Sequence, residues 1–137
     1  MSTTIPTTEG DLAFVRSMFD AFGRGDLAAF ADGLHPDATW NHRNPDRLGG
    51  LHDGRDAILE FLRASGELTA GTLRAVPETL MGDGDGQVAA VMRVSGERPD
   101  GRHLDDRQVL LCALGDGRVR RFDQYIGDPP AVTAFWA

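Results

Sequence analysis

The sequence predicts an α+β fold in which three helices pack on one face of a curved, mostly antiparallel sheet. In the first half of the chain, apolar residues recur at helical spacing in three segments, with one short alternating segment among them. Four longer extended segments follow, and the turns that join them are rich in Asp-Gly, which is typical of antiparallel hairpins. At 137 residues, the chain is long enough for one domain with a core and a pocket.

Two helices are expected before the first strand. A flexible arm of residues 1–9 precedes them, and residues 10–137 form the single domain. The first helix ends at Gly23, and its apolar stripe consists of Leu12, Val15, Met18, Phe19 and Phe22. Asp26 is a good N-cap for a second, short helix that ends near His35.

A short strand, a loop and a third helix follow. Trp40 and His42 alternate with polar residues, as in a strand with two different faces. The Pro, Gly and Asp residues between positions 44 and 54 suit turns and no packed element. Asp53 is then expected to cap a helix over residues 54–65.

The extended segments cover residues 72–80, 87–98, 103–114 and 118–126, which gives the order α-α-β-α-β-β-β-β. Successive hairpins of this kind form a meander. Pro129 and Pro130 end the last strand, and Phe135 and Trp136 are expected to close one end of the core or to form an oligomer contact.

Composition and charge exclude several classes of function. Fourteen basic and 21 acidic residues give a net charge of −7, so nucleic acid is not an expected partner. The absence of lysine excludes Schiff-base and other catalytic-lysine mechanisms. The longest apolar run, residues 109–114, is too short to span a membrane, and residues 1–11 show no targeting signal. A single cysteine, Cys112, fits a reducing cytoplasm and a place in the core.

The order of segments resembles a known superfamily. The resemblance is carried by Gly25-Asp26, by LHPDATW, by the helix GRDAILEF and by the closing stretch DGRVRRFDQYIGDP. Over about residues 10–136, this pattern resembles the SnoaL-like branch of the nuclear transport factor 2 and ketosteroid isomerase superfamily. The resemblance implies a cone-shaped α+β barrel with one deep apolar pocket, in a homodimer.

The resemblance also implies candidate site residues. When DATVEDP, which carries the general base of the bacterial ketosteroid isomerases, is laid over residues 37–43, His42 takes the place of their catalytic aspartate. Met18 takes the place of their oxyanion tyrosine, and their protonated aspartate falls in the apolar stretch near Leu110. The SnoaL-like cyclases carry an acid/base aspartate in a segment similar to RRFDQY, which maps it onto Asp123.

The limonene epoxide hydrolases offer a second comparison. They use an aspartate, an arginine and a second aspartate, and Asp105, Arg107 and Asp123 supply these groups in a different order. Trp40 and His42 replace the tyrosine and asparagine of that family.

We therefore predict His42, Asp123 and Arg107 as catalytic residues. An imidazole in an apolar pocket can take up and return a proton, Asp123 can orient it or act as the base, and Arg107 can steady an oxyanion. Each has a structural alternative: a histidine bonded at the pocket rim, an ion pair of Asp123 with Arg107 or Arg121, and an Arg107 on the outer face.

The expected walls of the pocket are Trp40, Met18, Phe22 and Tyr125, although such residues also form plain core. Alternation assigns Asp123, Val119 and Tyr125 to one face of the last strand, and a β-bulge could reverse this assignment. The four histidines lack metal-site spacing, and no Gly-rich phosphate loop is found, so neither a metal nor a cofactor is expected.

The prediction is a cofactor-independent enzyme, a cyclase or isomerase that moves protons on a polyketide-like or polycyclic secondary metabolite. One alternative is a non-catalytic protein that binds a hydrophobic small molecule or serves another enzyme. Another is an epoxide-hydrolase-like hydrolase in which Asp123 activates water. These alternatives differ in whether His42, Asp123 and Arg107 meet at one cavity.

Overall fold

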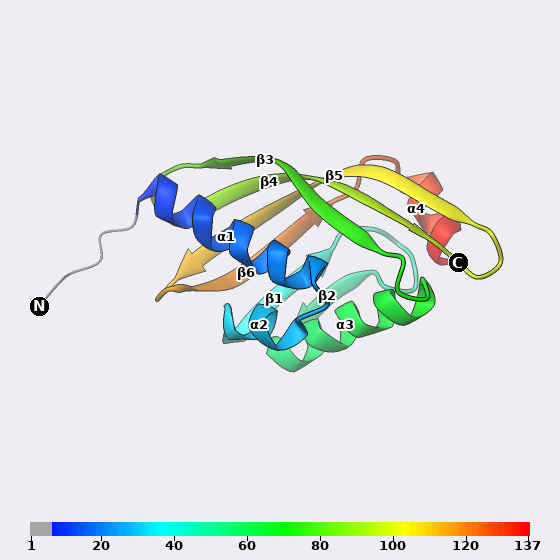
Figure 1. Ribbon diagram of the computed structural model, residues 1–137, viewed down its shortest axis with the longest axis horizontal. Helices are drawn as coiled ribbons and strands as arrows, with labels where there is room; N and C mark the ends of the chain where they lie inside the picture. Colours follow the sequence, from blue (N-terminus) through cyan, green and yellow to red (C-terminus); the bar gives the residue numbers. More distant parts are fainter. Residues whose placement is uncertain (1–6) are drawn as a thin grey trace, which may run out of the picture.

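The computed structural model describes residues 7–137 as a curved sheet of six strands with helices packed on one face (Figure 1). The elements in chain order are α1 (Thr8–Gly23), α2 (Leu27–Asp32), β1 (Leu34–His42), β2 (Gly50–Asp53), α3 (Arg55–Leu68), β3 (Arg74–Gly82), β4 (Gln87–Glu97), β5 (His103–Gly115), β6 (Arg118–Tyr125) and α4 (Pro129–Trp136). The α+β prediction is confirmed.

The strands lie in the order β2-β1-β6-β5-β4-β3. All neighbouring pairs are antiparallel except β1 and β6, which run parallel. Since β2 and β3 remain edges at opposite ends, the sheet is not closed, and the barrel that the resemblance implied is replaced by an open, curved sheet.

Helix α1 begins earlier than expected. The hydroxyl of Thr7 accepts a backbone N–H of the first turn at 2.9 Å. Acidic side chains in that turn stabilise the helix, because they lie near the positive end of its dipole. The flexible arm predicted for residues 1–9 is therefore wrong for Thr8 and Glu9, which are helical. The part of that arm in residues 1–6 lies outside the described residues.

Helix α2 is capped by Asp26, as predicted, through a carboxylate that accepts a backbone N–H at 3.0 Å. The prediction that this helix reaches His35 is wrong. The backbone from Leu34 onward belongs to β1, and Leu34 already pairs with Val119 of β6. Pairing with a distant strand thus overrides the local helical spacing.

Strand β2 was not predicted, because the loop between residues 44 and 54 carries turn residues. It is held by antiparallel pairing to β1, with His52 opposite Trp40. Asp53 belongs to β2, so the prediction that Asp53 caps α3 is wrong. The N-cap is Gly54, whose φ of +98° favours glycine, and no side chain caps the helix.

The four meander strands are confirmed to within two residues at each end. Helix α4, which follows them, was not predicted. Asp128 caps it, and Pro129 and Pro130 stand in its first turn, where the missing N–H groups cost nothing. Phe135 and Trp136 are buried, and α4, which carries them, lies at one end of the molecule (Figure 1).

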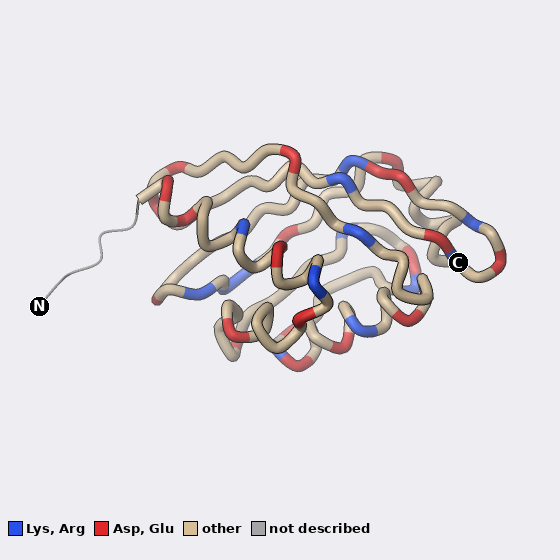
Figure 2. Tube along the Cα trace, in the orientation of Figure 1, with Lys and Arg blue, Asp and Glu red and all other residues tan. Residues whose placement is uncertain are grey.

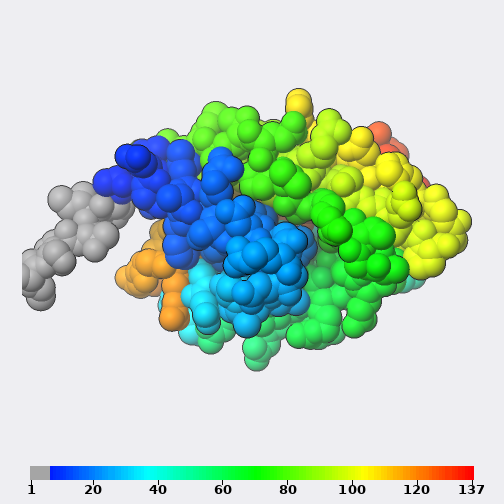
Figure 3. All heavy atoms as spheres, viewed as in Figure 1, coloured from blue at the N-terminus to red at the C-terminus, as the bar shows by residue number. Residues whose placement is uncertain are grey.

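The core lies between the helices and the inner face of the sheet. Phe30 of α2 and Phe122 of β6 are fully buried and stacked, with ring centroids 6.2 Å apart. The space-filling view shows α1 and α2 lying against one another over the strands (Figure 3). Acidic and basic positions are interspersed along the chain (Figure 2). In residues 7–137, no helix has the length and apolar character to cross a membrane.

Candidate functional site

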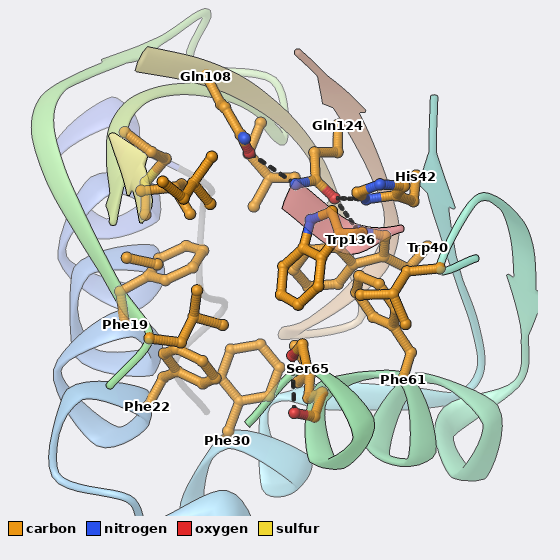
Figure 4. Close-up of a pocket in the computed structure, with 18 residues that line it drawn as sticks. Phe19, Phe22, Phe30, Trp40, His42, Phe61, Ser65, Gln108, Gln124 and Trp136 are labelled. Atoms are coloured by element: carbon orange, nitrogen blue, oxygen red, sulfur yellow. Dashed lines mark hydrogen bonds between the residues drawn. The ribbon is translucent and has the colours of Figure 1, made fainter. Parts of the chain in front are cut away.

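A cavity of about 70 Å³ lies between the helices and the sheet (Figure 4). Its wall is largely aromatic, formed by Phe19, Phe22, Phe30, Trp40, Phe61 and Trp136, with aliphatic side chains between them. Polar groups gather where three strands meet: His42 of β1, Gln108 of β5 and Gln124 of β6. An apolar wall with a few convergent polar groups is typical of a small-molecule site.

Strand β1 presents Trp40 and His42 to the cavity, as the alternation predicted. The indole of Trp40 packs between Phe61 and Phe122, with centroid distances of 5.3 and 4.6 Å. His42 is 3% exposed, and its ring lies 5.7 Å from that of Phe61. The histidine is therefore held in one place by aromatic packing on the side of α3.

A chain of hydrogen bonds joins the polar side chains of the three strands (Figure 4). Trp40 Nε1 donates to Gln124 Oε1 at 2.9 Å, and His42 Nδ1 lies 2.9 Å from the same oxygen. Gln124 Nε2 donates to Gln108 Oε1 at 2.7 Å. Gln108 Nε2 then donates to Asp106 Oδ2 at 3.1 Å. The polar edge of the cavity is thus one connected network.

On its far side, His42 contacts a buried carboxylate. His42 Nε2 lies 2.9 Å from Asp46 Oδ2, which also accepts from Asn44 Nδ2, and Asp46 Oδ1 accepts the backbone N–H of Leu48 at 2.8 Å. Burial raises the pKa of Asp46, but the hydrogen bonds from His42 and Asn44, the charge of His42 and the Leu48 N–H together hold it below its ordinary value. Asp46 is therefore an ionised partner of the histidine.

Helix α4 completes the wall by carrying Trp136. At its start, Asp106 accepts the backbone N–H groups of Gly127 and Asp128, both at 3.1 Å. At its end, Arg98 donates to the Phe135 carbonyl at 2.9 Å, and Arg102 donates to the Ala137 carbonyl at 2.6 Å. Cations at the carbonyl end of a helix stabilise it, so both ends of α4 are anchored.

Asp123 and Tyr125 do not reach the cavity, so their predicted placement beside His42 is wrong. A bulge at Arg120 shifts the register between β5 and β6, so Val119 and Phe122 point inward. Asp123 lies on the outer face, where Arg43 contacts it at 3.0 Å and Arg121 at 3.4 Å. Tyr125 is 42% exposed, and the Arg43 guanidinium lies 5.1 Å from its ring centroid.

Arg107 is also on the outer face, so its predicted place in the pocket is wrong. Its side chain is 66% exposed and pairs with Glu78 of β3 at 3.2 Å. Its strand neighbour Asp105, the other group needed for the epoxide hydrolase comparison, pairs with Arg93 at 2.9 Å. The three groups of that comparison therefore face away from the cavity, and hydrolysis by them has no support.

Of the predicted walls, Phe22 and Trp40 line the cavity, whereas Met18 does not. Met18 is buried against Gly33, where an added Cβ would lie 2.7 Å from its sulfur. The prediction of Met18 as a substrate-binding residue is therefore wrong, because the short α2–β1 connection occupies that side of α1. Cys112 is fully buried in the core, as predicted.

Three polar residues of the site were missed. Gln108 alternates in step with the inward-facing Leu104 and Leu110 of β5, and Gln124 alternates in step with Phe122 of β6. Both glutamines therefore lie on the inward face of their strands. This signal was present in the sequence, but the opposite phase of each strand also holds apolar residues. Asp46 stands in a loop and has no periodic signal. In residues 7–137, no three His, Cys, Asp or Glu side chains are grouped so that they could ligate one metal ion.

Comparisons with known proteins agree on the fold and family. The model of a family described as SnoaL-like domain matches residues 15–122. An uncharacterized protein of Mycobacterium tuberculosis is 34% identical over 131 residues, covering 96% of this chain and 99% of the relative. Bal32a, from a soil-derived mobile gene cassette, is 29% identical, covers 95% of this chain and 98% of its own, and superposes with a TM-score of 0.91.

Two further solved structures bear on fold and function. An NTF2-like protein of Burkholderia pseudomallei is 24% identical, covers 93% of this chain and 97% of its own, and shares the fold with a TM-score of 0.82. A Sinorhizobium meliloti protein provisionally named a polyketide cyclase is 27% identical. It covers 82% of this chain and 93% of its own, and superposes with a TM-score of 0.66. The homodimer and the cytoplasmic location stay predictions.

Proposed function

This chain belongs to the SnoaL-like domain family, and on that premise we propose that it is a cyclase- or isomerase-type enzyme that moves a proton on a small apolar molecule. The observation that carries the proposal is the buried pair of His42 and Asp46 at the cavity wall. The polyketide cyclase name of a structural neighbour supports the same reaction type.

The pair has the parts that proton transfer needs. The side chain of Asp46 is 0% exposed, so its charge acts on His42 with little screening by water. It orients the ring through Nε2 and stabilises the imidazolium, while Nδ1 faces Gln124 at the cavity edge. Isomerisation and intramolecular ring closure return every proton they remove, so the histidine ends each cycle as it began. Such chemistry requires no cofactor.

The aromatic wall favours a planar, unsaturated substrate. Rings of Phe19, Phe30 and Trp136 surround the cavity from three elements, and offset stacking on such rings stabilises an aromatic or polyene ligand. Together with the few polar groups of the wall, this favours a polyketide-like ring system with one or two oxygens near His42 over a sugar or a charged metabolite.

Non-catalytic binding of a hydrophobic molecule is the second candidate. One observation favours it: both ring nitrogens of His42 are already bonded within the protein, to Gln124 and Asp46. A histidine with both nitrogens engaged is also a common structural arrangement. Catalysis requires that a substrate replace the contact with Gln124, whereas simple binding does not.

Hydrogen–deuterium exchange separates the two candidates. The probes are 2-tetralone and 2-indanone, apolar ring ketones whose α-protons exchange in D₂O when a proton is removed and a deuteron returned. We expect the protein to accelerate exchange above the buffer rate, and His42→Asn to reduce the acceleration by at least ~100-fold, the usual contribution of a general acid or base. Exchange is followed by ¹H NMR.

Asp46→Asn is expected to reduce the exchange rate as well, and Asp123→Asn on the outer face is the matched control, which should leave it unchanged within about twofold. If both ketones bind and neither exchanges faster than in buffer, the binding candidate replaces catalysis. Full exchange in a folded His42→Asn variant would remove His42 from the mechanism.

A further inference from the structure

A second and larger space lies beside the cavity that holds His42. The cavity itself has a volume of about 70 Å³, whereas sites that enclose a whole drug-sized molecule measure about 300–1,000 Å³. The neighbouring hollow measures about 600 Å³ and is bounded by the α1–α2 turn, the last turns of α3 and the start of β3 (Figure 1). The cavity alone therefore holds only part of a larger ligand, and the room for the rest lies next to it.

Three apolar side chains line both spaces and separate them. They are Phe22 at the end of α1, Leu62 of α3 and Leu73 just before β3. Phe22 and Leu73 are only partly buried, so they have room to move. Rotation about side-chain bonds can join the two spaces without breaking a hydrogen bond, because none of the three carries a polar group.

This partition stands across the cavity from the polar groups. Figure 4 shows Phe22 on the side opposite to His42 and Gln124. The proposed function places an oxygen of the ligand beside His42, so the other end of the ligand points toward Phe22. A ligand longer than the cavity therefore reaches the hollow at its apolar end.

Side chains from the rims do not fill the hollow. A Cβ added at Gly23 or Gly25 on one rim, or at Gly66 or Gly71 on the other, would meet no atom of the described residues within 4 Å. The second rim is held in place by its backbone, since the Gly71 N–H donates to the Gly66 carbonyl at 2.9 Å. The hollow is thus open space between two defined edges.

The basic residues on the rim already have partners. The guanidinium of Arg63 lies 2.7 Å from the carboxylate of Glu60. The guanidinium of Arg74 donates to the carbonyls of Gly71 and Leu73 at 3.0 and 2.9 Å. The rim therefore does not select for an anion, and the apolar partition at its base favours an uncharged hydrocarbon group.

We propose that the hollow is a binding site for an apolar chain, and that the substrate is an elongated molecule. Its ring fills the cavity with an oxygen at His42, and a chain on the far end of the ring passes Phe22, Leu62 and Leu73 into the hollow. This assignment deepens the proposed function and rests on it, because it names a second part of the same substrate.

Three ketones of one series test the proposal: acetophenone, 4-butylacetophenone and 2-butylacetophenone. The 4-butyl chain lies opposite the carbonyl, so it can enter the hollow, whereas the 2-butyl chain lies beside the carbonyl. Equilibrium dialysis gives each dissociation constant. We expect the 4-butyl compound to bind at least about tenfold more tightly than acetophenone, since each buried CH₂ group contributes. The 2-butyl isomer, with the same carbon count, should gain nothing.

Gly66→Trp and Gly23→Trp each place an indole in the hollow, one from each rim. Neither glycine has a positive φ, so a side chain is tolerated at both. Both variants are expected to remove the advantage of the 4-butyl chain and to keep acetophenone binding within about twofold. Ala13→Trp adds the same group at an exposed position of α1 outside the hollow, and it should keep the full advantage.

Equal affinity for acetophenone and its 4-butyl derivative, or an equal gain from the 2-butyl chain, would overturn the proposal without recourse to any variant. So would an advantage that survives in both tryptophan variants, or no binding of the three ketones up to their solubility limits. Loss of 2-tetralone exchange with the 4-butyl advantage intact contradicts only the catalytic function. Absence of the advantage with exchange intact contradicts only the chain site.

Discussion

Replacing Asp46 with asparagine is expected to destabilise the fold by about 3–5 kcal/mol, because a buried carboxylate that accepts several hydrogen bonds is lost. The carboxylate is completely buried and accepts from His42, Asn44 and Leu48. An asparagine keeps one oxygen, so its NH₂ group must face one or more of these donors. Each buried donor left without an acceptor costs about 1–3 kcal/mol, and a lost charge-assisted bond costs about 1.5–3 kcal/mol.

Urea unfolding at pH 7, followed by tryptophan fluorescence, measures this loss as a lower midpoint with an unchanged m-value. Asp105→Asn is the control, because Asp105 pairs with Arg93 at a half-exposed position on the outer face, where removal of an ion pair costs about 0–1 kcal/mol. A loss below about 1 kcal/mol for Asp46→Asn, or one equal to that of the control, would refute the assignment of Asp46 as a buried, hydrogen-bonded carboxylate.

The same carboxylate gives the stability a pH dependence of defined sign. Its pKa in the folded protein is below the ordinary value of 3.8, so at low pH the unfolded chain takes up the proton first. The stabilisation is fully present above pH 3.8 and is lost as the pH falls through the lowered value. The stability difference between the parent protein and Asp46→Asn should therefore narrow only below pH 3.8. If this stability difference already narrowed as the pH was lowered from 7 to 5, the lowered pKa of Asp46 would be contradicted.

Three other outcomes test the fold and the placement of side chains. Phe30→Ala should cost about 3–5 kcal/mol in urea unfolding, because a fully buried ring with three aromatic neighbours leaves a cavity; a loss under 1 kcal/mol would contradict this packing. Burial raises the pKa of the Cys112 thiol to about 12, so the native protein should resist a disulfide reagent at pH 8 and react fully in guanidinium; rapid reaction of the native protein would show an accessible thiol. Arg107→Gln should cost less than about 1 kcal/mol and leave the exchange of 2-tetralone unchanged, whereas loss of exchange would return Arg107 to the site.

Local patterns in the chain were sufficient to predict α1, α2, α3 and the four strands of the meander. The stripe of α1, the Asp26 cap and the Asp-Gly turns describe interactions between residues near one another in sequence, so they can be read without a structure. β2 and α4 were missed because they depend on partners far away, the edge of β1 for β2 and Asp106, Arg98 and Arg102 for α4.

In the candidate site, too, some residues could be placed from the local sequence pattern and others could not. Alternation alone placed Trp40 and His42 on one inward face, because β1 keeps a regular period from Ala38 to His42. It could not place Asp123, because a bulge at Arg120 reverses the phase of β6.

The sequence by itself therefore predicted the fold class, the family resemblance and the place of His42 on the inward face of β1. Only the tertiary structure decided that His42 meets Asp46, Gln108 and Gln124, while Asp123 and Arg107 face outward. The physical reason is that a strand's period reports which residues share a face. Which face is buried, and which polar groups meet there, depends on how strands distant in the chain pair, and the sequence pattern carries no direct record of that pairing.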